Sequence, residues 1–316
     1  MFGYEAEVRT FTLGDLPLIY RLKSRGISMD SESYLSRGLH TVGDAALSRL
    51  PPGSLGTPTV VARYGREHGF GQLRHAPESA DAHIVFMAPQ LTEPYTHLQE
   101  TVWLALLDGL TMLAGERGAL SLHAEVDENS AMFEALRRAG FATFTRQDLW
   151  LRQPDGGLPT PQNTVYLRPA RPADKAAVRF LHAQIVPRLA QPADPIPNGD
   201  GLVYVCGGEV RGYLAVRAGN RGIYLRPYVH EADLPHLPAI LTGALWMVPR
   251  TTALPVYCCV RQYQPWLEGP LAALGFAPWA RQTVMVRHTA ARVERPAFAD
   301  LSAVQGGYTL HGPNHC

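Results

Sequence analysis

The sequence predicts an α/β (α+β) protein made of two similar units, and three observations lead to this prediction. The first is an internal repeat, in which residues 136–152 and 271–287 share Leu, Gly, Phe, Ala, Arg, Gln and Arg at identical spacing. The second is that segments typical of strands and helices precede both copies in the same order. The third is the stretch 152–161, whose three prolines and two glycines cannot continue a strand or a helix and therefore indicate a linker.

Both units are predicted to contain the same series of elements. Each begins with a short strand, at 8–11 or 166–169, and an amphipathic helix that starts near Asp15 or Asp174. Each ends with a helix stopped by the repeated glycine and a strand of alternating side chains. Between them we expect a hairpin (59–63 with 69–73, and 202–206 with 210–216), a strand (83–87 and 222–225), a long apolar helix (95–115 and 234–247) and a further strand (120–126 and 256–260).

Composition and charge exclude several classes of protein. Of the 316 residues, 46% are hydrophobic and 18% are charged, as in an ordinary globular core. No apolar run reaches the roughly 18 residues that span a bilayer, and no basic segment with an apolar stretch opens the chain, so we expect a cytoplasmic protein without a membrane partner. Residues 1–155 carry 14 basic against 19 acidic side chains, and residues 156–316 carry 15 against 9. The basic excess of the second half is too mild to indicate a nucleic-acid partner.

The four cysteines do not indicate a metal or redox site. None belongs to a Cys-x-x-Cys pair, and Cys258 and Cys259 are neighbours in an apolar segment, where strand alternation sends their side chains to opposite faces. We therefore interpret Cys206, Cys258, Cys259 and Cys316 as buried structural thiols and expect no metal.

This order of elements, with Gly-Phe closing each last helix, resembles the GNAT superfamily of N-acetyltransferases. The best match runs from Val126 through Asn129 to Gly140 and Phe141, and it is similar to the second acyl-CoA motif of that family. The resemblance covers both units. It implies two tandem GNAT-like domains at 1–152 and 164–290, a linker at 153–163 and a tail at 291–316, and in each domain a mixed, mostly antiparallel sheet flanked by helices.

The resemblance also implies a chemistry. Acyl-CoA would lie in a V-shaped cleft where the fourth and fifth strands splay apart, and an amine would attack the thioester carbonyl while an acid or a carboxylate handles protons. Main-chain groups of the fourth strand would hold the pantetheine arm. In the first unit these cofactor-binding candidates are Val85, Phe86 and Met87.

Four side chains near the expected cleft are further site candidates. Glu125, Tyr228 and His230 are candidates for acid or base catalysis, and Asn129 is a candidate cofactor ligand in the second motif. Each has a structural alternative. In this alternative, Glu125 lies on the surface at the end of a strand. Tyr228 and His230 satisfy each other's hydrogen bonds in a loop, and Asn129 caps a helix.

Both units depart from the family at the loop that binds pyrophosphate. The family uses Arg/Gln-x-x-Gly-x-Gly/Ala, because glycines let backbone N–H groups close on phosphate at a helix N-terminus. The corresponding stretches 88–97 and 226–235 contain no glycine. Carboxylates near the helix start would instead cap the dipole themselves and repel phosphate. These are Glu93 in the first unit and Glu231 and Asp233 in the second.

A second departure leaves two functions open. Many family members place a tyrosine that protonates the leaving thiolate where this chain has Leu136 and Leu271. One hypothesis is an acyl-CoA-dependent N-acetyltransferase that uses acetyl-CoA and acts on an unknown small-molecule amine, with one or both units active; the first unit keeps the fuller motif. The alternative is a catalytically inactive GNAT-like protein that binds a small molecule or a protein partner. The sequence is compatible with a homodimer in both cases.

Overall fold

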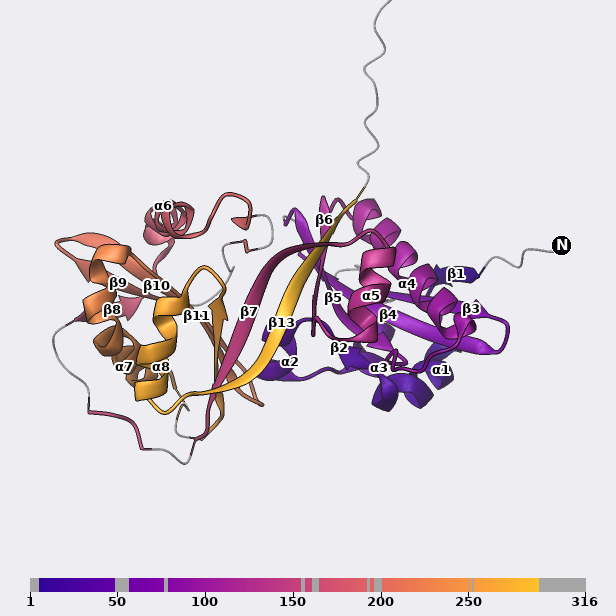
Figure 1. Ribbon diagram of the computed structural model, residues 1–316, viewed down its shortest axis with the longest axis horizontal. Helices are drawn as coiled ribbons and strands as arrows, with labels where there is room; N and C mark the ends of the chain where they lie inside the picture. The colour runs from indigo at the N-terminus through magenta and orange to yellow at the C-terminus, as the bar shows by residue number, and fades with distance from the viewer. Residues whose placement is uncertain are drawn as a thin grey trace, which may run out of the picture.

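Two similar units lie side by side along the long axis of the molecule, and the long strands β7 (Ala142–Arg152) and β13 (Ala277–His288) run between them (Figure 1). The computed structural model describes residues 6–48, 57–76, 79–154, 157–160, 165–191, 194–195, 201–249, 251 and 253–289. The tail predicted at 291–316 lies outside these residues. Within them, no helix has the length and apolar character that a membrane span requires.

The N-terminal unit contains every element that the sequence predicted and three more. Its elements are β1 (Glu7–Thr10), η1 (Leu13–Asp15), α1 (Leu16–Leu22), η2 (Lys23–Arg25), β2 (Ile27–Ser28), α2 (Ser31–Arg37), α3 (Thr41–Leu47), β3 (Thr59–Tyr64), β4 (Glu67–His75), β5 (Asp81–Ala88), α4 (His97–Glu116), β6 (Ser121–Val126), α5 (Ala131–Arg138) and β7. The prediction lacked β2, α2 and α3. They are short: β2 has two residues, and α2 and α3 have seven each.

The C-terminal unit repeats the predicted order. Its elements are β8 (Tyr166–Pro169), η3 (Pro172–Asp174), α6 (Lys175–Ile185), β9 (Gly201–Cys206), β10 (Glu209–Ala218), β11 (Ile223–Val229), η5 (Glu231–His236), α7 (Leu237–Met247), β12 (Val256–Arg261), η6 (Pro265–Leu267), α8 (Glu268–Ala273) and β13. The glycines that stop α5 and α8 have left-handed backbones, with φ of 84° at Gly140 and 82° at Gly275, as the repeat predicted.

The strands form one sheet that crosses both units. Among the described residues its order is β1-β3-β4-β5-β6-β13-β7-β12-β11-β10-β9-β8. The β5–β6 and β11–β12 pairs are parallel, and the other neighbours in this order are antiparallel. The expectation of a mixed, mostly antiparallel sheet is therefore confirmed.

The last strand of each unit pairs with the sheet of the other unit. β13 lies between β6 and β7, with Thr283 opposite Val126, and β7 lies beside β12, with Arg152 opposite Val256. The two cores are exchanged in the same way. Met285 is fully buried in the N-terminal core, and Trp150 is buried in the C-terminal core. Each unit therefore completes its core with a side chain from the other half of the sequence.

The first helix of each unit starts at an arginine–aspartate clamp. Both oxygens of Asp15 accept hydrogen bonds of 2.6 Å from Arg9, and both oxygens of Asp174 accept hydrogen bonds of 2.7 Å from Arg168. Asp15 also accepts a bond from the Thr12 N–H group. These bonds fix the turn between the first strand and the first helix, where the sequence predicted an aspartate at the helix start.

Other local expectations need correction. The N-cap of α5 is Ser130, whose Oγ accepts a bond of 3.3 Å from the Phe133 N–H group, so Asn129 does not cap that helix. At α4 a capping box of Thr96 and Gln99 occupies the role that was expected for Glu93. The reason is position, because Glu93 precedes the first helical residue by four places and a cap must immediately precede it.

The prediction of buried thiols is confirmed for Cys258 and Cys259 and is wrong for Cys206. Cys258 and Cys259 are buried on opposite faces of β12, in two different core clusters. Cys206, in contrast, is exposed, because it ends β9 beside the Gly207–Gly208 turn. Cys316 lies outside the described residues. Among those residues, no group of three or more His, Cys, Asp or Glu side chains is placed to hold a metal ion.

Candidate functional site

The gap between β5 and β6 is filled by the chain itself. The two strands pair only over their first three residues and then separate, and β2 lies along β5 in the gap. The Met29 N–H group donates to the Val85 carbonyl at 3.3 Å, and the Glu125 N–H group donates to the Met29 carbonyl at 3.0 Å. The segment 27–29 is therefore hydrogen-bonded to both strands and occupies the space between them.

The main chain of Val85, Phe86 and Met87 has partners within this segment. The Val85 carbonyl also accepts a bond of 3.2 Å from the Ser28 hydroxyl, and Ile27 and Ser28 lie opposite Met87 and Phe86 in the strand register. The approach is close, because a Cβ atom on the preceding residue, Gly26, would lie 2.2 Å from the Phe86 ring. A ligand that uses these main-chain groups must first displace β2.

The corresponding gap in the C-terminal unit holds side chains. β11 and β12 pair over Ile223–Leu225 and then separate. Beyond that point Pro227 has no N–H group to offer, and its carbonyl accepts a bond of 2.8 Å from Gln264 Nε2. Arg226 and Arg261 extend from the two separating strands and are 8% and 2% exposed. Such burial of charge requires counter-ions.

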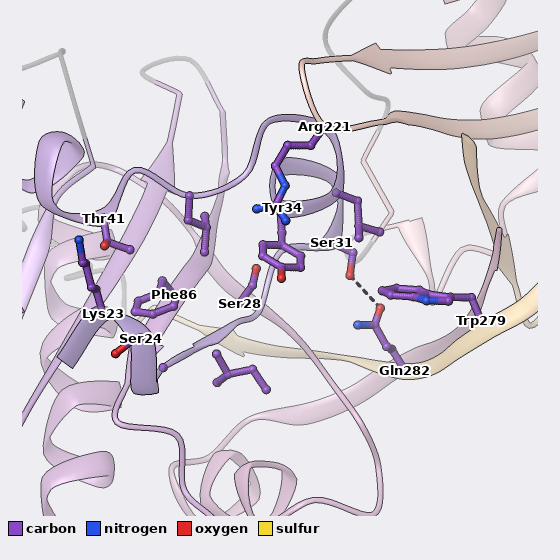
Figure 2. Close-up of a pocket in the computed structure, with 14 residues that line it drawn as sticks. Lys23, Ser24, Ser28, Ser31, Tyr34, Thr41, Phe86, Arg221, Trp279 and Gln282 are labelled. Carbon is purple, nitrogen blue, oxygen red and sulfur yellow. Dashed lines mark hydrogen bonds between the residues drawn. The ribbon is translucent and has the colours of Figure 1, made fainter. Parts of the chain in front are cut away.

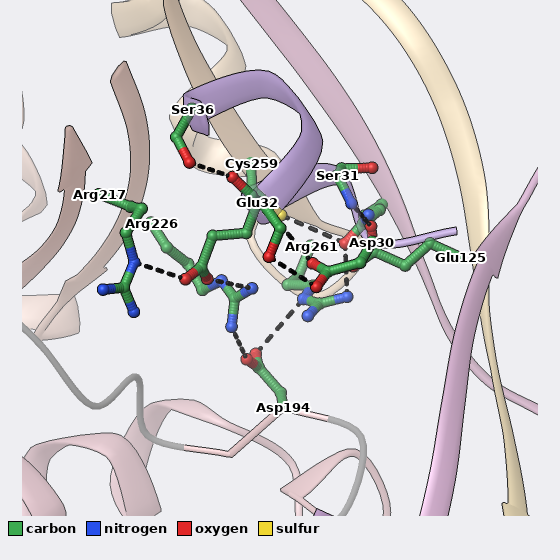
Figure 3. A network of polar contacts seen from close by, with 12 residues as sticks. Asp30, Ser31, Glu32, Ser36, Glu125, Asp194, Arg217, Arg226, Cys259 and Arg261 are labelled. Atoms are coloured by element: carbon green, nitrogen blue, oxygen red, sulfur yellow. Dashed lines mark hydrogen bonds and ion pairs between the residues drawn. The ribbon is translucent and has the colours of Figure 1, made fainter. Parts of the chain in front are cut away.

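Asp194 supplies the main counter-charge (Figure 3). It is completely buried, and its carboxylate lies 3.1 Å from Arg226 Nη1 and 3.5 Å from Arg261 Nε. It also accepts hydrogen bonds from the hydroxyls of Tyr228, at 2.9 Å, and Tyr263. Burial alone would raise the pKa of Asp194, but Arg261, Arg226 and the two phenols outweigh it and lower the pKa to about 2.

Helix α2 connects this ionic cluster to the N-terminal unit. Its Glu32 carboxylate lies 3.0 Å from Arg217 Nε and 3.7 Å from Arg226 Nη2. At the helix start the Ser31 N–H group donates to Glu125 at 2.8 Å, and Asp30 lies 2.7 Å from Arg74. These side chains surround a polar cavity of about 220 Å³ between the units. We call this set of residues the ionic cluster.

A larger pocket lies on the other side of α2 (Figure 2). It has a volume of about 520 Å³ and is lined by β2 and α2 of the N-terminal unit and by β13 and the β10–β11 turn of the C-terminal unit. Tyr34, Phe86 and Trp279 contribute aromatic rings to it. On its floor the Ser31 hydroxyl donates to Gln282 Oε1 at 2.9 Å, which joins the two units. We call this the inter-unit pocket.

A third pocket opens at the start of α4. It has a volume of about 390 Å³, and three exposed arginines, Arg21, Arg25 and Arg66, line it together with one carboxylate, Glu67, and the amides of Gln90 and Gln99. None of these arginines has an ion pair or a side-chain hydrogen bond with a described residue. The pocket lies beside the loop where the family resemblance implies a pyrophosphate site.

Comparisons with solved structures identify the architecture. A GCN5-related N-acetyltransferase from Sphaerobacter thermophilus matches with a TM-score of 0.58 and 12% identity, over 92% of this chain and 97% of that one. A tandem GNAT protein from the clavulanic acid biosynthesis pathway matches with a TM-score of 0.50 and 16% identity, over 90% of this chain and 99% of that one. The chain has a tandem GNAT fold. No protein-family model and no curated protein matches the sequence.

Within this GNAT fold, two of the three catalytic candidates border the ionic cluster. Glu125 is buried rather than on the surface, because β13 and the start of α2 cover the end of β6. Tyr228 is buried against His182 and bonded to Asp194. Burial and the Asp194 carboxylate raise the pKa of Tyr228 well above its ordinary value, so the phenol stays protonated at neutral pH.

His230 and Asn129 lie apart from this cluster. His230 Nδ1 accepts a bond of 3.2 Å from the Ala232 N–H group and lies 3.1 Å from Arg211, so Tyr228 and His230 have separate partners and are not bonded to each other. Asn129 is exposed, and its N–H group donates to Asp127. Asp233, expected to cap a helix dipole, pairs with Arg211 at 2.8 Å.

Of the ionic cluster, the sequence pointed to Glu125 but not to Asp194, Arg226 or Arg261. Asp194 lies in a proline-rich stretch that reads as an ordinary loop. Arg226 and Arg261 had a detectable signal, because each interrupts or ends an apolar strand that is predicted to be buried. An arginine in such a place needs a buried partner, so the two positions together predict an ion-pair site.

Acid is expected to weaken this fold between about pH 4 and pH 2. The pKa of folded Asp194 lies at about 2, below the ordinary value of 3.8, so its ion pairs stabilise the fold above about pH 4 and lose that contribution as the pH falls through about 2. Urea unfolding at pH 7, 4, 3 and 2.5 tests this. A midpoint that stays constant down to pH 2.5 contradicts the prediction.

Proposed function

We propose that this chain is a GNAT-fold protein that binds a small molecule in the inter-unit pocket and does not transfer an acyl group from a coenzyme held between β5 and β6. The observation that carries the proposal is the segment 27–29, which occupies the splay and bonds to Val85 and Glu125. The glycine-free loops and the leucines at 136 and 271 support it, because they remove phosphate-binding backbone and a proton donor in both units.

The inter-unit pocket supports the binding part of the proposal. Its volume lies in the range of roughly 300–1,000 Å³ that small-molecule sites occupy. Apolar rings and a few polar groups line it together, which is the usual composition of a ligand site. Both units contribute residues to its wall. The second copy of the fold is therefore needed to form the pocket, because it supplies strand β13.

A second candidate function is an acyl-CoA-dependent N-acetyltransferase acting on a small amine, with acetyl-CoA as co-substrate. The pocket at Arg21, Arg25 and Arg66 favours it, because these three cations at the start of α4 can bind anionic phosphates. They would take the place of the glycine-rich backbone that both units lack. This function requires β2 to leave the splay when the coenzyme binds.

Acetyl-CoA at 1 mM, in a thermal-shift experiment, separates the two functions. We expect no rise in the melting temperature, because a ligand stabilises a fold only if it binds the native state. An acetyltransferase with known coenzyme binding, tested in parallel, controls for sensitivity. A concentration-dependent rise that disappears in the Arg25→Gln, Arg66→Gln double variant contradicts the proposal and supports the second function.

A further inference from the structure

We infer that the inter-unit pocket takes an anionic ligand with a flat aromatic body, such as an aromatic carboxylate; the inference rests on the proposed function and names its ligand class. Figure 2 shows the arrangement that carries it. Cationic and neutral donors, aromatic rings and hydroxyls line the pocket, and none of the described residues that line it is an aspartate or a glutamate.

Among the described residues that line the pocket, the charged side chains are both cationic. Lys23 and Arg221 line it, and within the described part of the chain neither side chain forms an ion pair with a carboxylate. Both are positioned by aromatic rings instead. Lys23 Nζ lies 4.2 Å from the centre of the Tyr20 ring, and the Arg221 guanidinium lies 5.3 Å from that of Tyr34. The two side chains lie at different sides of the pocket (Figure 2), so a ligand carboxylate placed beside either one meets a counter-ion, whereas an ammonium group there meets a like charge.

A neutral donor adds to this preference. Gln282 Oε1 accepts bonds from both Ser31 Oγ and Gln147 Nε2, which fixes the orientation of the amide. Its Nε2 atom has no hydrogen-bond partner among the described residues, and it can donate to a ligand in the pocket. An oxygen acceptor on the ligand satisfies this group, and an ammonium group cannot.

The rings specify the body of the ligand. Phe86 and Trp279 lie toward opposite ends of the pocket, with Tyr34 between them (Figure 2). Trp279 is 47% exposed, although a tryptophan is ordinarily well buried. Its ring makes an edge-to-face contact with Tyr257, with ring centres 5.4 Å apart, and it also lines the pocket. A flat ring stacked there would cover this exposed surface.

Matched ligands of opposite charge test the inference on the whole chain. Isothermal titration calorimetry with indole-3-acetate and 2-naphthoate is compared with tryptamine and 2-naphthylmethylamine, and phenyl phosphate distinguishes a carboxylate from a phosphate preference. We expect the carboxylates to bind at least about tenfold more tightly than the amines, since each charged hydrogen bond contributes about a factor of ten. Tryptophan fluorescence should change on binding, and this change should be lost in Trp279→Phe while binding persists.

Variants locate the site. Arg221→Gln and Lys23→Gln should each weaken carboxylate binding about tenfold. Arg179→Gln, on the exposed surface of α6, is the matched control and should leave it unchanged. Thermal unfolding of each variant shows whether it is folded.

The inference is overturned if the amines bind as tightly as the carboxylates or if no member of either series binds. It is also overturned if Arg221→Gln leaves the affinity for the carboxylates unchanged. These outcomes do not depend on acetyl-CoA. Failure of the proposed function appears instead as stabilisation by acetyl-CoA that depends on Arg25 and Arg66, so the two failures are distinguishable.

Discussion

An Asp194→Asn variant is expected to lose about 3–5 kcal/mol of unfolding free energy, the range measured when one partner of a buried ion pair is removed. The substitution keeps the size of the side chain and removes its charge. Arg226 and Arg261 then remain buried, and the hydroxyls of Tyr228 and Tyr263 lose their charged acceptor. Urea unfolding followed by circular dichroism at pH 7 measures the loss.

Two comparison variants show whether the loss at Asp194 comes from the buried charges. Asp148→Asn removes the pair with Arg281, in which the two side chains are 30% and 79% exposed, and should cost about 0–1 kcal/mol. Adding Arg226→Met to Asp194→Asn should recover part of the stability, because one of the stranded charges is gone. A loss at Asp194 no larger than the loss at Asp148 contradicts the prediction, because it shows that the buried ion pairs of Asp194 stabilise the fold no more than an exposed pair does.

Trp150→Ala is expected to destabilise the fold by about 3–5 kcal/mol and to loosen the C-terminal unit first, although Trp150 belongs to the N-terminal half of the sequence. The side chain is 7% exposed and packs in the core with α7 and β12. Met285→Ala is the mirror variant. It should cost about 2–5 kcal/mol and loosen the N-terminal unit.

Hydrogen exchange measured by mass spectrometry reads out which unit is loosened. In Trp150→Ala, protection should fall most in β11 and α7, and in Met285→Ala it should fall most in β6 and α4. Leu106→Ala provides a control, because this residue lies in the N-terminal core and belongs to the N-terminal half. If Trp150→Ala instead loosens β6 and α4, the cores are not exchanged.

Most elements of the fold could be predicted from the sequence, but β2, α2 and α3 could not, and neither could the pairing of the strands. Hydrophobic period and the repeated glycines are local signals, and they located the other strands and the long helices correctly. The choice between β6 and β12 as the neighbour of the last strand is not local. Residues 146–147 and 281–282 are the same Arg-Gln pair in both copies, so either strand carries a pattern that fits either sheet.

The candidate site shows the same limit. Val85, Phe86 and Met87 lie on the strand where they were expected, yet the partner of that strand is the segment 27–29. Those residues have no period and no motif, and only the fold brings them to β5. Glu125 was expected at the surface because β6 ends there in the sequence, whereas α2 and β13 cover it in space.

The position of β13 between β6 and β7 has a consequence for how the protein is made. Val126 and Thr283 face each other in the sheet although they are about half a chain length apart. During synthesis the N-terminal unit therefore waits, with one edge of β6 unpaired and the place of Met285 empty, until nearly all of the described chain has left the ribosome. An unpaired edge is a site for association with other chains. The N-terminal unit is thus made first but completed last. The protein is most exposed to misassembly in the interval between the synthesis of β6 and that of β13.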